Sequence, residues 1–363
     1  MVHPVAAGVL VAASAGITWT IPVITVTVNI VTVDADRIPS LLRGAWPDVE
    51  VGSAVPLSGG FWAAMFRVPV RHQPAGVADE VVVRLAPHRA MGAKEAEVQR
   101  AVAAQGFPTP PVWLSCPDET SGGWWSVMDY CPGAPLLTGL DGMAVLRRAP
   151  ALLRTLPTQL AATMASLHRL DPEPVTAAVR AAAGDVAWSA SEVLDHLRLG
   201  AAAARRPDVA AALDRLVADA PTSEQAVVCH GDLHPFNILD HGGALDVVDW
   251  TGAVVADPCF DLAFTELLLA NPPLALPRQL APVGAAAGRL LARRFITAYT
   301  RANPSVALDP LEWFRALHSA RVLIEVTNLR TTHGRGAGGH PFASVAPGAA
   351  SNLAAATGVN ISP

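Results

Sequence analysis

The sequence predicts an α+β fold with two lobes, in which a small strand-rich lobe precedes a larger helical lobe. Three observations support this prediction. Short β-branched runs gather before residue 130, long helical stretches follow it, and one polar segment near residue 235 interrupts the helical part. The chain has 363 residues, of which 51% are hydrophobic and 16% charged, so it can fill the cores of two such lobes.

The first lobe is predicted from strand-like runs separated by turn residues. The expected strands lie on both sides of a glycine turn within 51–70 and at 81–86, 111–116 and 124–130. The stretch from Lys94 to Gln105 contains neither proline nor glycine and favours a helix. Cys131-Pro132-Gly133 then indicates a hinge between the lobes.

The second lobe is predicted from helical periodicity. Apolar residues recur at spacings of four and three at Leu156, Leu160, Met164 and Leu167, and 191–219 and 310–330 are also expected to be helical. A strand at 226–229, a polar loop at 230–237 and a hairpin turned at His241-Gly242-Gly243 interrupt these helices. The region 331–363 is rich in Ala, Gly, Ser and Pro, which predicts a disordered tail.

The N-terminal segment 1–33 has no charged residue between Pro4 and Val33, and an uncharged run of this length is a candidate membrane span. Pro22 interrupts it, several threonines dilute its apolarity, and neither lysine nor arginine precedes it. We therefore expect an extension outside the fold rather than an anchor, and both alternatives stay open.

Charge and cysteine content narrow the function classes. A net charge of −5 and a pI near 6.1 argue against the broad basic surface that nucleic-acid binding needs. The four cysteines show no CxxC or Cys/His metal spacing, and free cysteines favour a reducing cytoplasm. A cytoplasmic protein is the expectation.

Polar side chains concentrate between residues 228 and 250. If the apolar runs around His241-Gly242-Gly243 pair as a hairpin, Asn237 and Asp249 come close together beside the loop that holds Asp232. Asn and Asp oxygens suit Mg²⁺, and a further free carboxylate can orient a hydroxyl for phosphoryl transfer. A single Asp in a turn is usually an Asx-turn or a helix cap, and a single His is usually just a satisfied polar residue, so the spacing of the whole set carries the prediction.

These residues resemble a known family. The segment His230-Gly231-Asp232-Leu233-His234-Pro235-Phe236-Asn237, then Asp249-Trp250, then Asp257-Pro258-Cys259-Phe260-Asp261-Leu262-Ala263, is similar to the motifs of the aminoglycoside/macrolide phosphotransferase and choline-kinase superfamily, which is related to protein kinases. The resemblance implies a two-lobed protein-kinase-like fold with a nucleotide-binding lobe at 34–130 and a helical lobe at 131–330 that carries the catalytic loop and the acceptor site.

The same resemblance implies roles for residues of the polar hairpin. Asp232 would be the catalytic base or hydroxyl-orienting carboxylate, with His230 fixing its loop. Asn237 and Asp249 would hold magnesium. Asp261 would cap a helix or brace the loop.

In the first lobe the resemblance implies a nucleotide site. Arg84 would bind phosphate where many members have lysine, and Glu95, with Glu97 as the alternative, would pair with it. The other implied nucleotide-binding residues are the phosphate-covering turn Ser58, Gly59 and Gly60 and the hinge backbone of Asp129 and Cys131.

The expected function is transfer of the γ-phosphoryl group of ATP to a hydroxyl of a small molecule. A protein kinase is the first alternative, although His234 stands where protein kinases carry lysine and no Ala-Pro-Glu landmark follows Asp249. A nucleotide-binding pseudokinase is the second. The acceptor and the choice between ATP and GTP stay open.

Overall fold

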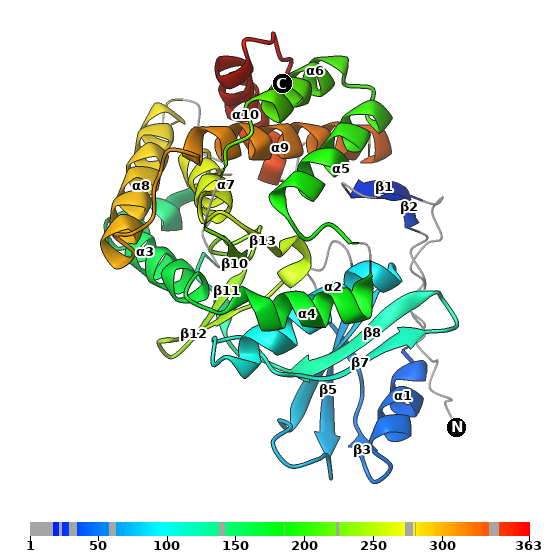
Figure 1. Ribbon diagram of the computed structural model, residues 1–363. Coiled ribbons are helices and arrows are strands. Elements are labelled where there is room, and N and C mark those ends of the chain that lie inside the picture. The colour runs from blue at the N-terminus through cyan, green and yellow to red at the C-terminus, as the bar shows by residue number, and fades with distance from the viewer. Residues whose placement is uncertain are drawn as a thin grey trace, which may run out of the picture.

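The computed structural model describes residues 17–21, 24–28, 35–57, 63–137, 142–184, 186–222, 225–272, 279, 281–333 and 341–363. A sheet-based part and a larger helical part lie against each other (Figure 1). One hydrophobic core contains buried residues from Ile38 to Val127, and a second extends from Val98 to Ile361. The expected α+β fold, with strands first and helices after, is confirmed.

Six strands form the first part. They are β3 (Glu50–Val51), β4 (Val55–Pro56), β5 (Ala64–Arg71), β6 (Glu80–Ala86), β7 (Val112–Asp118) and β8 (Gly123–Asp129). The sheet order is β3-β5-β6-β8-β7, with β4 paired to β5, and all pairs are antiparallel. The central strand β6 has a partner on each edge, and Val81, Val83 and Leu85 pack into the first core, so most of its β-branched run is buried. The strands expected from residue 51 to residue 130 are found within a few residues of their predicted bounds.

Two helices accompany this sheet. Helix α1 (Arg37–Ala45) buries Ile38 and Leu42 against it. Helix α2 (Arg89–Ala104) packs against β7 and β8 and also contacts the helical part, so it bridges the two cores. It begins five residues before Lys94, so Gly92 lies inside the helix. A Cβ at Gly92 would stand 2.5 Å from Cβ of Trp124, which explains why this position carries glycine.

The second part is built from helices around one irregular, strand-containing segment. The helices are α3 (Gly142–Leu167), α4 (Pro172–Ala183), α5 (Ala190–Ala203), α6 (Pro207–Ala218), α7 (Cys259–Ala270), α8 (Ala281–Ala302), α9 (Leu311–His333) and α10 (Pro341–Thr357). The segment between α6 and α7 contains β10 (Val227–Cys229), β11 (Ile238–His241), β12 (Ala244–Val247), the short 3-10 helix η1 (Trp250–Gly252) and β13 (Val254–Ala256), and β9 (Ala134–Pro135) pairs with β11.

The region 191–219 is two helices rather than one. Helix α5 ends at Ala203, Arg205 adopts a positive φ of 54°, and Pro207 starts α6. A proline is well placed at the first position of a helix and poorly placed inside one, so the chain turns here.

The prediction of a disordered tail over 331–363 is wrong for the residues described. Helix α9 continues to His333, and α10 packs along it. The side chains of Val345, Ala346, Ala349 and Leu353 are fully buried. These residues recur at helical spacing, so they form one buried face of α10. The small residues around them permit close packing of the two helices. A composition typical of disorder is therefore found here in a helix–helix contact.

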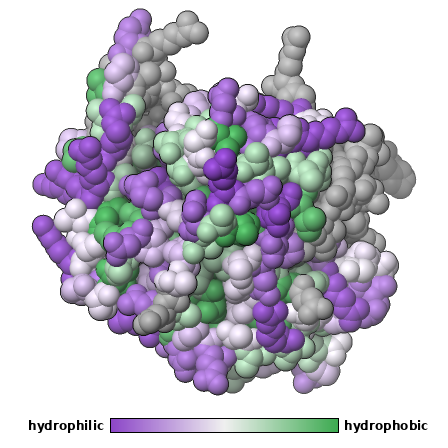
Figure 2. Space-filling model, turned by 45° about the horizontal axis from the view of Figure 1, so that its top comes forward, coloured by the Kyte–Doolittle hydropathy of each residue, from purple (hydrophilic) through white to green (hydrophobic). Residues whose placement is uncertain are grey.

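Within the segment 1–33, the strands β1 (Ile17–Ile21) and β2 (Ile24–Val28) pair as an antiparallel hairpin near α5 and α9 (Figure 1). No helix among the described residues combines the length and apolarity needed to cross a membrane. On the face in Figure 2, hydrophobic residues lie in small patches separated by hydrophilic ones.

Candidate active site

The polar loop predicted at 230–237 lies between β10 and the hairpin of β11 and β12. Strand β10 pairs with β13, and β11 pairs with β12 across the predicted turn at His241-Gly242-Gly243. In this register Ile238 faces Val247, and the N–H of Val248 donates to the carbonyl of Asn237 at 3.0 Å. The hairpin therefore carries Asn237 and Asp249 to the same end, beside the loop, as the sequence analysis expected.

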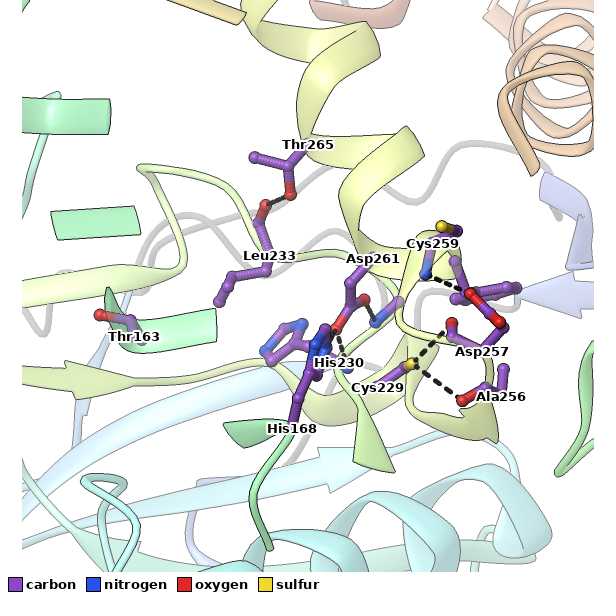
Figure 3. Close-up of polar contacts among 12 residues, drawn as sticks. Thr163, His168, Cys229, His230, Leu233, Ala256, Asp257, Cys259, Asp261 and Thr265 are labelled. Atoms are coloured by element: carbon purple, nitrogen blue, oxygen red, sulfur yellow. Dashed lines mark hydrogen bonds and ion pairs between the residues drawn. The ribbon is translucent and has the colours of Figure 1, made fainter. Parts of the chain in front are cut away.

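The loop is held by one buried carboxylate (Figure 3). Asp261, in the first turn of α7, accepts the N–H of His230 at 2.8 Å on Oδ2 and the N–H of Gly231 at 2.6 Å on Oδ1. His168 also lies 3.2 Å from Oδ2. Burial alone would raise the pKa of Asp261, but these partners together lower it, so the carboxyl group stays ionised. Asp261 braces the loop, as expected.

Gly231 makes this arrangement possible. Its φ is +74°, and a Cβ at this position would lie 2.0 Å from the carbonyl oxygen of Gly252. Only glycine combines this backbone conformation with so close an approach to a neighbouring chain segment. The loop therefore passes over η1 at Gly252 and presents the next residue, Asp232, at the surface of the site.

Asp232 has the features of a carboxylate available for chemistry. Its Oδ1 is buried and accepts no hydrogen bond from the described residues, whereas Oδ2 lies 3.4 Å from Nδ2 of Asn237. Burial raises the pKa of Asp232 to about 6, although His234 and Arg321 oppose the rise. A buried carboxylate oxygen that receives no hydrogen bond is costly, so Oδ1 of Asp232, whose charged neighbour Arg321 lies 3.9 Å away, is a candidate acceptor for a ligand's hydrogen bond.

The side-chain amide of Asn237 is oriented by the same loop. Its Nδ2 donates to the backbone carbonyl of Asp232 at 3.0 Å. The amide oxygen is then the atom left for a cation. Asn237 is 9% exposed, so little solvent can reach that oxygen.

Asp249 belongs to a chain of polar contacts that reaches the sheet. Oδ1 of Asp249 accepts the hydroxyl of Thr251 at 2.6 Å, and that hydroxyl lies 3.2 Å from Oε2 of Glu95. Glu95 forms the expected ion pair with Arg84. Burial alone would raise the pKa of Asp249, but the positive charge of Arg84 and the Thr251 hydroxyl lower it. The carboxylate is thus kept ionised and able to bind a cation.

The contact of Arg84 with Glu95 agrees with the sequence prediction. Arg84 projects from β6, is 8% exposed, and its charge acts on Asp249. The alternative partner, Glu97, instead contacts Arg100. The only lysine, Lys94, is also buried but donates to the carbonyl of Ala187 at 3.1 Å. Arg84 is therefore the buried cation that shares a polar cluster with Asp249.

His230 and His234 have different surroundings. The ring of His230 is fully buried, stacks at a tilt on Trp250, and its Nε2 lies 3.1 Å from the carbonyl of Val248. Burial lowers its pKa, which favours the neutral ring. His234 instead stands with Nε2 3.7 Å from Oδ2 of Asp232. His230 therefore fixes the loop to the hairpin, and His234 faces the candidate catalytic carboxylate.

One residue of the site was missed from the sequence. Arg321 of α9 donates to the carbonyl of Gly231 at 2.7 Å, pairs with Glu325 at 2.9 Å, and lies 3.9 Å from Oδ1 of Asp232. Its guanidinium also covers the ring of Phe264. The available signal was an Arg and a Glu four residues apart on one predicted helix, a pair easily mistaken for a solvated surface contact.

The predicted nucleotide contacts are only partly described. Ser58, Gly59 and Gly60 lie outside the described residues. At the hinge, the N–H of Asp129 donates to the carbonyl of Pro111 at 3.2 Å, and its carboxylate accepts the indole N–H of Trp113 at 2.7 Å. The N–H of Asp129 is thus engaged by the protein. Burial, with the nearby carboxylate of Asp246, raises the pKa of the Cys131 thiol to about 11.

The site taken together contains a loop carboxylate with a free oxygen, an amide and a second carboxylate side by side, and an arginine–glutamate pair linked to that second carboxylate. Comparison with known proteins agrees with this pattern. The profile of the phosphotransferase enzyme family matches residues 53–318, which include all of these groups. No curated protein matches the chain.

Several solved structures are similar to this fold. A provisionally assigned aminoglycoside phosphotransferase from Ralstonia eutropha JMP134 has a TM-score of 0.61 at 16% identity, covering 90% of this chain and 99% of that one. A thermostable mutant of aminoglycoside phosphotransferase APH(4)-Ia, in a ternary complex with AMP-PNP and hygromycin B, has a TM-score of 0.54 at 18% identity, covering 88% and 98%. The GDP complex of aminoglycoside 2′-phosphotransferase-IIIa has a TM-score of 0.54 at 16% identity, covering 90% and 99%.

Proposed function

The chain belongs to the phosphotransferase enzyme family, and from this premise we propose that it transfers the γ-phosphoryl group of ATP to a hydroxyl group of a small molecule. The observation that carries the proposal is the buried Oδ1 of Asp232, which accepts no hydrogen bond from the described residues. An acceptor hydroxyl placed at this oxygen would donate its hydrogen bond and later its proton to a carboxylate held rigidly by the braced loop.

Asn237 and Asp249 would hold Mg²⁺. Their oxygens are the hard donors that this ion prefers, and they lie at the same end of the β11–β12 hairpin. When bound, the ion would neutralise charge on the phosphates. Arg84, which Glu95 holds in place, would contribute a second, permanent positive charge toward the nucleotide phosphates.

The nucleotide is proposed to lie between the sheet and the β11–β12 hairpin. Arg84 lies on β6, and Cys131 follows the end of β8, the strand paired with β6. Ser58, Gly59 and Gly60 lie between β4 and β5 in the sequence and would cover the phosphates. Residues 34–130 would then form the nucleotide-binding lobe and residues 131–330 the acceptor-binding lobe.

The proposal is tested by the products. The purified full chain is incubated with Mg²⁺, ATP and a panel of hydroxylated small molecules that includes aminoglycosides, which similar proteins bind. We expect acceptor-dependent formation of ADP and a phosphate ester detectable by phosphorus NMR. ADP release that no member of a broad panel accelerates, with no phosphorylated product, would contradict a small-molecule kinase. Replacing ATP by GTP in the same assay determines the donor.

The pH profile of the reaction is predicted from Asp232. Because burial raises the pKa of Asp232 to about 6, kcat/KM is expected to fall about tenfold per pH unit below that value, as the carboxylate becomes protonated. Arg321 lowers this pKa, so the limb of an Arg321→Gln variant should move to higher pH. Initial rates at subsaturating acceptor across the acidic pH range measure the acidic limb of the profile for the parent protein and for the variant. A profile that stays flat well below the pKa would contradict the role of Asp232.

The metal role is predicted from Asp249. An Asp249→Asn variant is expected to bind ATP in the presence of Mg²⁺ at least about tenfold more weakly, because a neutral amide oxygen is a poorer ligand for Mg²⁺ than a carboxylate. Calorimetric titrations with and without Mg²⁺ separate the metal-dependent part of the affinity. An unchanged benefit from Mg²⁺ would mean that Asp249 does not bind the ion.

A further inference from the structure

A second group of metal-binding side chains lies where the segment after β8 meets the β11–β12 hairpin. Cys131 comes two residues after β8, His241 ends β11, and Asp246 is in β12. The Sγ of Cys131 lies 3.7 Å from Nδ1 of His241 and 3.3 Å from Oδ2 of Asp246. Nδ1 of His241 lies 3.3 Å from the same oxygen of Asp246. Three different donor atoms therefore converge on one point.

These separations match the edges of a tetrahedron around zinc. With Zn–S bonds of about 2.3 Å and Zn–N and Zn–O bonds of about 2.1 Å, tetrahedral angles place S about 3.6 Å from N or O, and N about 3.4 Å from O. The three observed distances of 3.7, 3.3 and 3.3 Å lie within about 0.3 Å of these values. An ion could enter with side-chain movements smaller than a bond length.

The donor set selects the kind of ion. A thiolate and an imidazole are poor ligands for Mg²⁺ and good ligands for Zn²⁺, and a carboxylate completes a combination that zinc accepts. The side chains of His241 and Asp246 are 38% and 22% exposed, so an ion from solvent can reach them.

The other Cys-His-Asp group among the described residues shows the contrast. His168, Cys229 and Asp261 are fully buried. Both oxygens of Asp261 accept backbone N–H groups of the catalytic loop, and His168 also contacts Tyr299. That group is already satisfied by the protein, whereas the side-chain contacts of the first group join its own three members, and Cys131 has a further hydrogen bond only from the backbone of Gly133 among the described residues.

We propose that Cys131, His241 and Asp246 bind one Zn²⁺ ion, with water at the fourth position. The thiol of Cys131 now donates its hydrogen to Asp246, and zinc would replace that proton between the same two atoms. The ion would cross-link the segment that leaves the sheet to the hairpin that leads to Asp249. This segment already pairs with the hairpin through Ala134 and Asp240, so the cross-link would reinforce an existing crossing.

Cobalt(II) tests this site directly, because it occupies zinc sites and gives a thiolate-to-metal charge-transfer band that oxygen ligands do not produce. Metal-free full-length protein is titrated with Co²⁺ and then with Zn²⁺. We expect the band to saturate at one equivalent and to disappear when Zn²⁺ displaces Co²⁺. The Cys131→Ser variant should lose the band, and His241→Ala should weaken binding more than about tenfold, the least that the loss of supporting groups costs in metal sites.

A matched control is the Cys116→Ser variant, which removes the other partly exposed cysteine. It should keep the full band, and thermal unfolding without metal establishes that all variants fold. Absence of the band in the parent protein, its survival in Cys131→Ser, or its loss in Cys116→Ser would each overturn the proposal. Because an oxygen-only site gives no such band, magnesium binding at Asn237 and Asp249 does not affect the result.

Discussion

Replacing Asp232 by asparagine is expected to lower kcat by about 100- to 10,000-fold, the usual contribution of a positioned general base. Asparagine preserves the shape and the contact with Asn237, but it cannot take a proton from the acceptor. Because Asp232 is not expected to bind metal, nucleotide affinity in the presence of Mg²⁺ should change by no more than a few-fold. The loss should therefore appear in turnover rather than in nucleotide binding.

Steady-state rates with the best acceptor and a calorimetric titration with a nonhydrolysable ATP analogue measure the two quantities separately. The matched control is Asp195→Asn, the same chemical change at a carboxylate on α5 that is 70% exposed. It should leave both quantities unchanged. Near-normal turnover in Asp232→Asn would remove Asp232 from the chemistry, and a large loss of nucleotide affinity would assign it to the metal instead.

Replacing Arg84 by alanine is expected to weaken the binding of ATP with Mg²⁺ by about 10- to 100-fold. One charge-assisted hydrogen bond contributes about 1.5–3 kcal/mol, and each 1.4 kcal/mol corresponds to tenfold in affinity. Arg84→Lys should recover part of this affinity, because it restores the charge but not the planar fork that contacts two oxygens at once.

Stability must be separated from binding in this experiment. Removing one partner of a buried ion pair costs about 3–5 kcal/mol, so Arg84→Ala leaves Glu95 uncompensated and should also lower the melting temperature. Affinity is therefore measured well below that temperature. The control is Arg67→Ala on the neighbouring strand β5, whose partner Glu80 is partly exposed. Equal nucleotide affinity in Arg84→Ala and the parent would place the phosphate-binding cation elsewhere.

Local sequence was sufficient where each structural signal is contained within a few residues. The β-branched run at 81–86 and the turn at His241-Gly242-Gly243 each specify their own conformation through side-chain and backbone preferences. The contact between Arg84 and Glu95 that the family resemblance implied also appears in the structure. The buried setting of Arg84 required a partner, but the resemblance identified Glu95 as that partner.

The predictions were wrong where the local sequence suggested one structure and packing against a distant part of the chain produced another. The helix predicted from Lys94 begins instead at Arg89 and includes Gly92, where Trp124 leaves no room for a side chain. The tail from residue 331 looked disordered by composition, but Val345 and Leu353 bury a helix against α9. Glycine and proline weaken the local preference for a helix, so packing against a partner surface decides whether such segments become helical.

The sequence by itself determined the strand-rich and helical parts, the hairpin that carries the candidate catalytic residues, and the family to which its motifs belong. Only the tertiary structure brought Arg321 from α9 to the carbonyl of Gly231 and to Asp232. It also brought Cys131 to His241 and Asp246, across more than 100 residues of chain. A motif records neighbours along the chain, whereas the electrostatic field at a carboxylate and the ligands around an ion depend on distance in space, which folding alone establishes.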